Sequence, residues 1–239
     1  MKQLTCLLTA ATLLAGVIHA AAPKDELLAA AKALADKPNY SWKTTVVVPE
    51  DAQFKPGPTD GKAEKGGVIM VSATGFQGNL MHTVKQGDKA ALTNQDGDWE
   101  SAADAENAEG FGRFRAMAAR NLKAPADLVA DIVTDVKELK QDGDVFSGEF
   151  TEEGAKNNMR FGGRAARGGP GGGPQILAAK GSAKFWVKDG VLAKMEIQVD
   201  GKMDFNGNEM EVIRTSTTEI KDVGTTKVEV PTAAKAKLK

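Results

Sequence analysis

The sequence predicts an α+β fold in which an antiparallel β-sheet carries helices on one face. Short segments rich in β-branched residues recur along the chain, and turn dipeptides such as Asp189-Gly190 and Asn206-Gly207 separate them. A stretch with helical periodicity interrupts these segments in the middle of the chain. Such regular spacing is typical of an antiparallel meander, whose apolar face has to be covered by a second layer.

The first half of the chain predicts one helix and then a series of strands. Residues 21–36 form a helix because Leu27, Leu28, Ala31 and Leu34 recur at helical spacing, and the helix stops near Pro38. The expected strands are residues 40–50, 68–74, 79–85 and 89–94. Residues 51–66 hold several glycines and prolines, so we expect a loop with at most the start of a strand.

The second half predicts two central helices and then long strands. The first helix has an apolar face of Phe111, Phe114, Met117, Ala118 and Leu122, and the second starts at Pro125 and presents Leu128, Val129, Ile132, Val136 and Leu139. We then expect strands over residues 145–150, 182–188, 191–199, 209–221 and 227–230, a short helix from Thr151, and a weak helix after Pro231. In residues 191–199 the odd-numbered side chains should face the core.

The N-terminus has the pattern of an export signal. A short basic start precedes an apolar run over residues 4–18, which is too short to cross a bilayer, and small residues follow it. We expect a signal peptide over residues 1–20 rather than a buried N-terminal helix, and one domain over residues 21–239. Residues 162–174 are low in complexity and rich in glycine and proline, which predicts a mobile surface loop.

Charge and cysteine content narrow the function. The chain has 31 basic and 32 acidic residues, whereas a nucleic-acid-binding protein usually has a basic excess. Removal of residues 1–20 takes away Cys6 and His19, so the mature chain has no cysteine, cannot form a disulfide and has no cysteine for a lipid anchor. We therefore expect a soluble periplasmic or secreted protein, without a covalent anchor.

The sequence offers little for catalysis. Only His82 is left for a histidine-based metal site or nucleophile system, and a lone histidine in a strand is usually a packing or surface residue. Asn94, Asp96 and Asp98 imitate the start of a calcium loop, but the glycine is misplaced, which predicts a hairpin turn. We expect no catalytic residue, metal or cofactor. A hydrolase built on two carboxylates remains an alternative, because their separation in space is not visible in the sequence.

The remaining signal is apolar surface on strands and helices. An ordinary core between sheet and helices explains it, whereas a curled sheet would enclose a cavity that suits an acyl chain. If residues 209–220 alternate strictly, Arg214 lies on the same side of the strand as Met210, where it would meet the head group of a lipid in such a cavity. The alternative is that a bulge or an exposed strand end places Arg214 elsewhere. The candidate lining residues are Trp42, Val46, Met70, Met117, Met195, Ile197, Met210 and Arg214.

Three segments resemble the periplasmic lipoprotein-carrier superfamily of LolA- and LppX-like proteins. They are YSWKTTV from residue 40, FWVKDGVLAKMEIQV from residue 185 and TSTTEIKDVGTTKVEVP from residue 215. The resemblance implies a curved antiparallel half-barrel with helices on its concave face, around an apolar cavity. It also implies non-enzymatic binding of a lipid or an acylated protein in the cell envelope. The glycine-rich segment and the lack of an anchoring cysteine depart from the family pattern.

We therefore expect an exported, monomeric carrier or binding protein for a hydrophobic ligand such as a lipid or acyl chain, in transient contact with the envelope. The alternative is a structural or interaction module of the envelope, with a filled core and no ligand.

Overall fold

The computed structural model describes residues 22–52, 55–74, 78–108, 112–160, 175–205 and 207–238. The predicted signal peptide over residues 1–20, Phe111 and the glycine-rich segment over residues 162–174 lie outside the described residues. Within the described part, no helix is long and apolar enough to cross a membrane.

Helices occur at four points along the described chain. They are α1 (Pro23–Ala35), α2 (Ala102–Glu106), α3 (Gly112–Arg120), α4 (Pro125–Asp135), α5 (Glu152–Met159) and α6 (Thr232–Lys235). Local chemistry explains their starts: α1 and α4 begin with a proline in the first turn, and the Thr151 hydroxyl accepts a hydrogen bond from Gly154 N at the start of α5.

The strands are antiparallel and join in one open sheet. They are β1 (Asn39–Val47), β2 (Thr59–Glu64), β3 (Val68–Thr74), β4 (Leu80–Gln86), β5 (Lys89–Thr93), β6 (Trp99–Ser101), β7 (Lys140–Asp142), β8 (Val145–Glu149), β9 (Gln175–Lys188), β10 (Val191–Phe205) and β11 (Asn208–Lys221). Their order is β6-β5-β4-β3-β2-β1-β11-β10-β9-β8-β7, so two meanders meet where the first strand pairs with the last.

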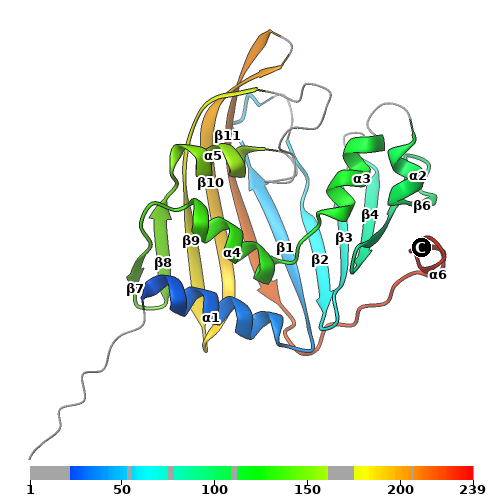
Figure 1. Cartoon of the computed structure of the whole chain (residues 1–239), viewed down its shortest axis with the longest axis horizontal. Coiled ribbons are helices and arrows are strands. Elements are labelled where there is room, and N and C mark those ends of the chain that lie inside the picture. Colours follow the sequence, from blue (N-terminus) through cyan, green and yellow to red (C-terminus); the bar gives the residue numbers. More distant parts are fainter. Residues whose placement is uncertain are drawn as a thin grey trace, which may run out of the picture.

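The α+β class is confirmed: the sheet is curved, is not closed into a barrel, and carries helices on its concave face (Figure 1). Two groups of helices cover different strands. Helices α1 and α5 pack on β9 and β10, with α4 against both helices, whereas α2 and α3 pack on β4, β5 and β6. Figure 1 shows β1 and β2 between the two groups.

Each helix group has its own core. The larger core joins Leu27 and Leu34 of α1, Val129 of α4, and Phe185 and Val199 of the sheet, all buried. The smaller core consists mainly of alanines from α2 and α3, packed on Ala90 and Leu92 of β5. Alanine at these positions lets the short helices lie close to the strand.

The first predicted central helix buries a different face from the one expected. Phe114 is 42% exposed, and Met117 is half-buried, whereas Gly112, Ala116 and Ala119 are buried. The prediction is therefore wrong at Phe114, because a short helix pressed on a strand needs small side chains at the contact. The most apolar face of the sequence is not the buried one.

The strand predictions missed β6 and β7, underestimated the lengths of β9 and β10, and differ from the structure in three further ways. Residues 59–64 (TDGKAE) form a full strand despite their polar sequence, because only Gly61 and Ala63 face the core. A register shift between Leu192 and Lys194 turns Leu192 into the core, where strict alternation had pointed it away. Residues 227–230 are not a strand, although α6 follows Pro231 as expected.

Candidate functional site

Strand register places six of the eight candidate residues on the concave face. Side chains of directly paired residues point to the same face of a sheet. Trp42 pairs with Ile220, Val46 pairs with Ser216, and Ser216 pairs with Ile197. The same ladder places on this face the remaining candidates of the two long strands: Met195, Met210 and Arg214.

Met70 and Met117 lie elsewhere. Met70 pairs with Lys62, which pairs with Ser41, the neighbour of Trp42 in sequence, so Met70 faces the outer side of the sheet. It lines a pocket there. Met117 is half-buried in α3. Met70 therefore does not share a surface with the candidates of the long strands, and Met117 lies on a helix that packs on the sheet rather than in the sheet.

Trp42 and Met195 belong to the filled core. They are 6% and 5% exposed and lie in the larger core together with Phe185. The Trp42 indole lies over Gly61 of β2, where any side chain would overlap its ring atoms, and its ring is 5.8 Å from that of Tyr40. These contacts give both residues a packing role in the larger core.

Next to this core, on the same face of the sheet, lies a strip of half-buried side chains, which we call the central strip. It runs along the concave face of the strands between the two helix groups. Its apolar members are half-buried rather than enclosed, and hydroxyl groups lie between them. The central strip consists of Thr44, Val46, Val71, Ala73, Ile197 and Ser216.

Arg214 borders the central strip and contacts the end of a helix. One of its terminal nitrogens donates to the carbonyl oxygens of Asn158 (2.7 Å) and Met159 (3.2 Å), at the C-terminus of α5. A cation is favourable there, because the last carbonyls of a helix carry partial negative charge. Burial lowers the pKa of the Arg214 guanidinium from its usual high value. The residue is thus neither at an exposed strand end nor in a bulge, and its contact with a lipid head group stays a prediction.

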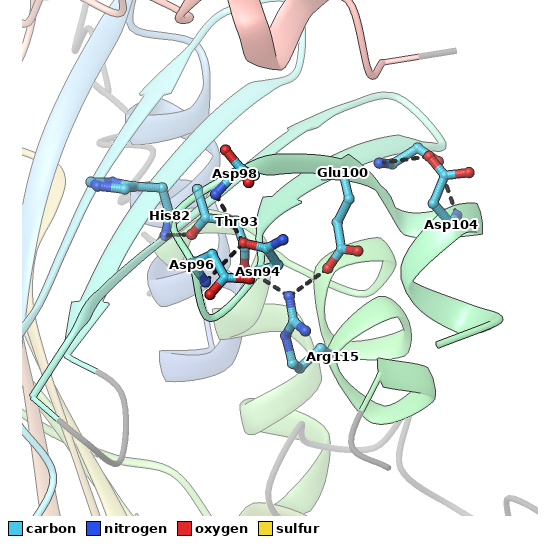
Figure 2. Close-up of polar contacts among 9 residues, drawn as sticks. His82, Thr93, Asn94, Asp96, Asp98, Glu100, Asp104 and Arg115 are labelled. Carbon is cyan, nitrogen blue, oxygen red and sulfur yellow. Dashed lines mark hydrogen bonds and ion pairs between the residues drawn. The ribbon is translucent and has the colours of Figure 1, made fainter. Parts of the chain in front are cut away.

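Polar residues beyond the central strip organise the edge of the sheet at β5 and β6 (Figure 2). Asn94 Oδ1 accepts hydrogen bonds from the backbone N–H groups of Asp96 (3.0 Å) and Asp98 (2.9 Å), which confirms the predicted hairpin turn. Arg115 of α3 donates to Glu100 and to the carbonyl of Thr93, both at 2.7 Å. Among the described residues, no group of three histidine, cysteine or acidic side chains is placed to hold a metal ion.

The outer face carries side chains that sequence reasoning did not select. Ser72 Oγ lies 2.8 Å from His82 Nδ1, and the His82 ring stacks on Trp99. In the part of the chain that the structure describes, no carboxylate hydrogen-bonds to this imidazole, so the pair lacks the orienting acid of a nucleophile system. The only available signal was the polar residues that alternate with apolar ones along each strand, and ordinary strands with one solvent-exposed face show the same pattern.

Comparisons with known proteins give a fold likeness at low identity. No family model matches the chain, and no curated protein matches it. Among solved structures, the chain is similar to LprF from Mycobacterium bovis, with 13% identity, 89% of this chain and 97% of that chain covered, and a TM-score of 0.45. It is also similar to the lipoprotein LppX from Mycobacterium tuberculosis (12% identity, 87% and 98% covered, TM-score 0.48). A LolA-superfamily protein from Nitrosomonas europaea gives 10% identity, 88% and 96% coverage and a TM-score of 0.36. Proteins of the superfamily that the sequence motifs resemble are thus among the solved structures to which this chain is similar.

Proposed function

We propose that the protein is an exported, non-enzymatic binding protein or carrier for a hydrophobic ligand, a lipid or an acyl chain, in the cell envelope. Residues 1–20 would direct export and residues 21–239 would form the binding domain. The ligand would lie along the central strip, with Val46 and Ile197 against its chain. Trp42 and Met195 would form the closed floor below it.

The central strip is the observation that carries this proposal. Helices cover the strands on both sides of it, yet Val46, Val71 and Ile197 stay half-buried on the concave face. Apolar side chains between two packed layers provide the kind of surface on which an acyl chain loses its contact with water. The hydroxyls of Thr44 and Thr218 bond to each other at 2.8 Å, which satisfies part of their hydrogen-bonding capacity next to Val46.

Two adjacent residues of β1 test the proposal. Val46 faces the central strip, whereas Val47 is 66% exposed on the opposite face. Val46→Lys should remove the bound ligand, because an ammonium group in an apolar strip is costly to desolvate. Val47→Lys adds the same charge one residue away on the outer face and should leave ligand binding unchanged.

The measurement is organic extraction of the purified full-length protein, followed by mass spectrometry, and titration with a fluorescent fatty acid. We expect lipid in the unchanged protein and in the Val47→Lys variant, and a loss of at least about tenfold in fatty-acid affinity for Val46→Lys, equivalent to ~1.4 kcal/mol. Lipid-free protein that also fails to bind the fatty acid would contradict the proposal. It would favour the envelope module with a filled core, which the continuous larger core also suits.

A further inference from the structure

A row of polar side chains crosses the outer face of the sheet. Lys43 of β1 pairs with Asp60 of β2, Asp60 pairs with Ser72 of β3, and Ser72 pairs with His82 of β4. Consecutive pairs of this kind place the four side chains side by side on one face, at the spacing of neighbouring strands. This outer row lies on the face opposite to the central strip.

The row ends on an aromatic pair. The backbone N–H of His82 donates to Thr93 Oγ1 at 2.9 Å, and Thr93 pairs with Trp99 of β6 (Figure 2 shows the contact of His82 with Thr93). The rings of His82 and Trp99 stack, with centroids 6.2 Å apart and planes 30° apart. The Ser72 hydroxyl, 2.8 Å from Nδ1, fixes the orientation of the imidazole. Both rings are half-buried.

The C-terminal segment turns this surface into a pocket. After β11 it crosses the sheet to α6, which contacts β5 and β6, and Asp222 and Pro231 line the pocket from its side. Ser41 Oγ donates to Asp222 at 2.8 Å, and Lys62 Nζ donates to the carbonyl of Lys227 at 3.2 Å, so the segment is tied to the strands. The pocket has a volume of about 660 Å³, within the range of small-molecule sites.

Charge and ring chemistry indicate the ligand. Three lysines line the pocket, Lys43, Lys62 and Lys221, against two aspartates, and Lys221 forms an ion pair with Glu219 at 3.3 Å, which leaves Lys43 and Lys62 to face an anion. Lys62 donates to an uncharged carbonyl, so its positive charge is not neutralised by that bond. At the other end of the pocket the imidazole and indole rings offer flat faces. Flat rings prefer offset stacking on other rings, and ammonium groups attract carboxylate or phosphate.

We propose that this pocket binds a small anion that carries a planar ring, such as an aromatic carboxylate or an aromatic phosphate. The ring would stack at His82 and Trp99, with Met70 beneath it, and the anionic group would face Lys43 and Lys62. A site of this kind is separate from the acyl-chain surface, because the two lie on opposite faces of the same strands.

The test uses three probes that separate charge from ring. Phenyl phosphate has both, inorganic phosphate has only the charge, and benzyl alcohol has only the ring. The full-length protein, prepared without a histidine tag and labelled at its two histidines, reports binding through the His82 imidazole signal, which a His82→Gln variant assigns. Calorimetry gives the affinities. We expect phenyl phosphate to shift the His82 signal with Kd of about 1 mM or tighter, and each partial probe to bind at least about tenfold more weakly.

Matched variants locate the site. Lys43→Gln should weaken phenyl phosphate about fivefold, the size of a single exposed charge interaction of ~1 kcal/mol. Lys184→Gln, also on the outer face, should not weaken it. Trp99→Leu should abolish the preference for phenyl phosphate over inorganic phosphate. Trp186→Leu should not, because Trp186 lies on the outer face in β9, between Lys184 and Lys194 and away from the pocket. Thermal unfolding confirms that each variant is folded.

Three results would overturn the proposal. The first is no shift of the His82 signal at several times the expected Kd. The second is equal affinity for phenyl phosphate and inorganic phosphate, which would leave only charge attraction. The third is an equal loss in the Lys43→Gln and Lys184→Gln variants, which would place the anion elsewhere on the surface.

Discussion

Gly61 of β2 gives the sharpest prediction for stability. It pairs with Trp42 across the sheet, and the indole lies directly over its Cα. A Cβ on this residue would overlap Cε2 and Cζ2 of Trp42. Because Trp42 is 6% exposed and packed in the larger core, the ring has to move against its neighbours to accept even one methyl group.

Two opposing terms set the size of the effect of Gly61→Ala. Alanine in a strand normally gains about 0.5–1 kcal/mol over glycine. Overpacking of a dense core costs about 1–3 kcal/mol, and a displaced indole also gives up part of its burial, at ~25 cal/mol per Å². We expect a net loss of about 1–3 kcal/mol in the free energy of unfolding, and a Tm lower by about 2–12 °C for a domain of this size.

Urea unfolding followed by circular dichroism measures this loss, and a double-mutant cycle with Trp42→Leu assigns it to the ring. Leucine lacks the atoms that meet the new methyl group, so Gly61→Ala should cost little, or stabilise, in that background. The expected coupling is about 1–3 kcal/mol. An unchanged or higher stability of the single variant would refute the packing argument, and so would the same loss in both backgrounds.

Two further predictions concern a buried phenol and a buried guanidinium. Burial raises the pKa of Tyr40 well above its ordinary value of about 10, so this residue should stabilise the folded state fully below about pH 10 and lose that contribution as the pH rises further. Tyr40 is the only tyrosine, so the ultraviolet absorbance of tyrosinate reports its ionisation alone. Ionisation near pH 10 in the folded protein would contradict the prediction. The Tyr40→Phe variant should lose less stability than the unchanged protein as the pH rises above about 10. Arg214→Met should cost about 1–3 kcal/mol, because the carbonyls of Asn158 and Met159 lose a charged donor, and hydrogen exchange should rise at the C-terminal turn of α5. Normal exchange in α5 together with unchanged urea unfolding would show that this contact does not stabilise the helix.

The fold was predictable where side-chain period and turn chemistry agree. Asp189-Gly190 joins two alternating strands, and both residues take the positive φ that this turn needs. Pro125 and the apolar stripe after it gave the helix that contains Val129 and Ile132. β2 was not predictable in this way, because its outer face is polar and its only buried residues are Gly61 and Ala63, both small, so the sequence shows no apolar alternation.

The candidate surface was less predictable, because alternation fixes a residue's face only when register is known. Within β10 and β11 the two-residue turn predicted at Asn206-Gly207 sets the register, so the pairing of Ile197 with Ser216 follows from the sequence once that turn is recognised. Met70 could not be assigned, since its face depends on how β3 pairs with a strand that the sequence did not reveal. A one-residue change of register would have reversed the result.

β1 links these observations, because it joins the two meanders and contributes to both faces. Lys43 points to the outer row, and Val46 points to the central strip. The ladder with β11 is the direct hydrogen-bonded connection between the two halves of the described sheet. A change in curvature at this ladder would bring side chains closer on the concave face and spread them on the outer face.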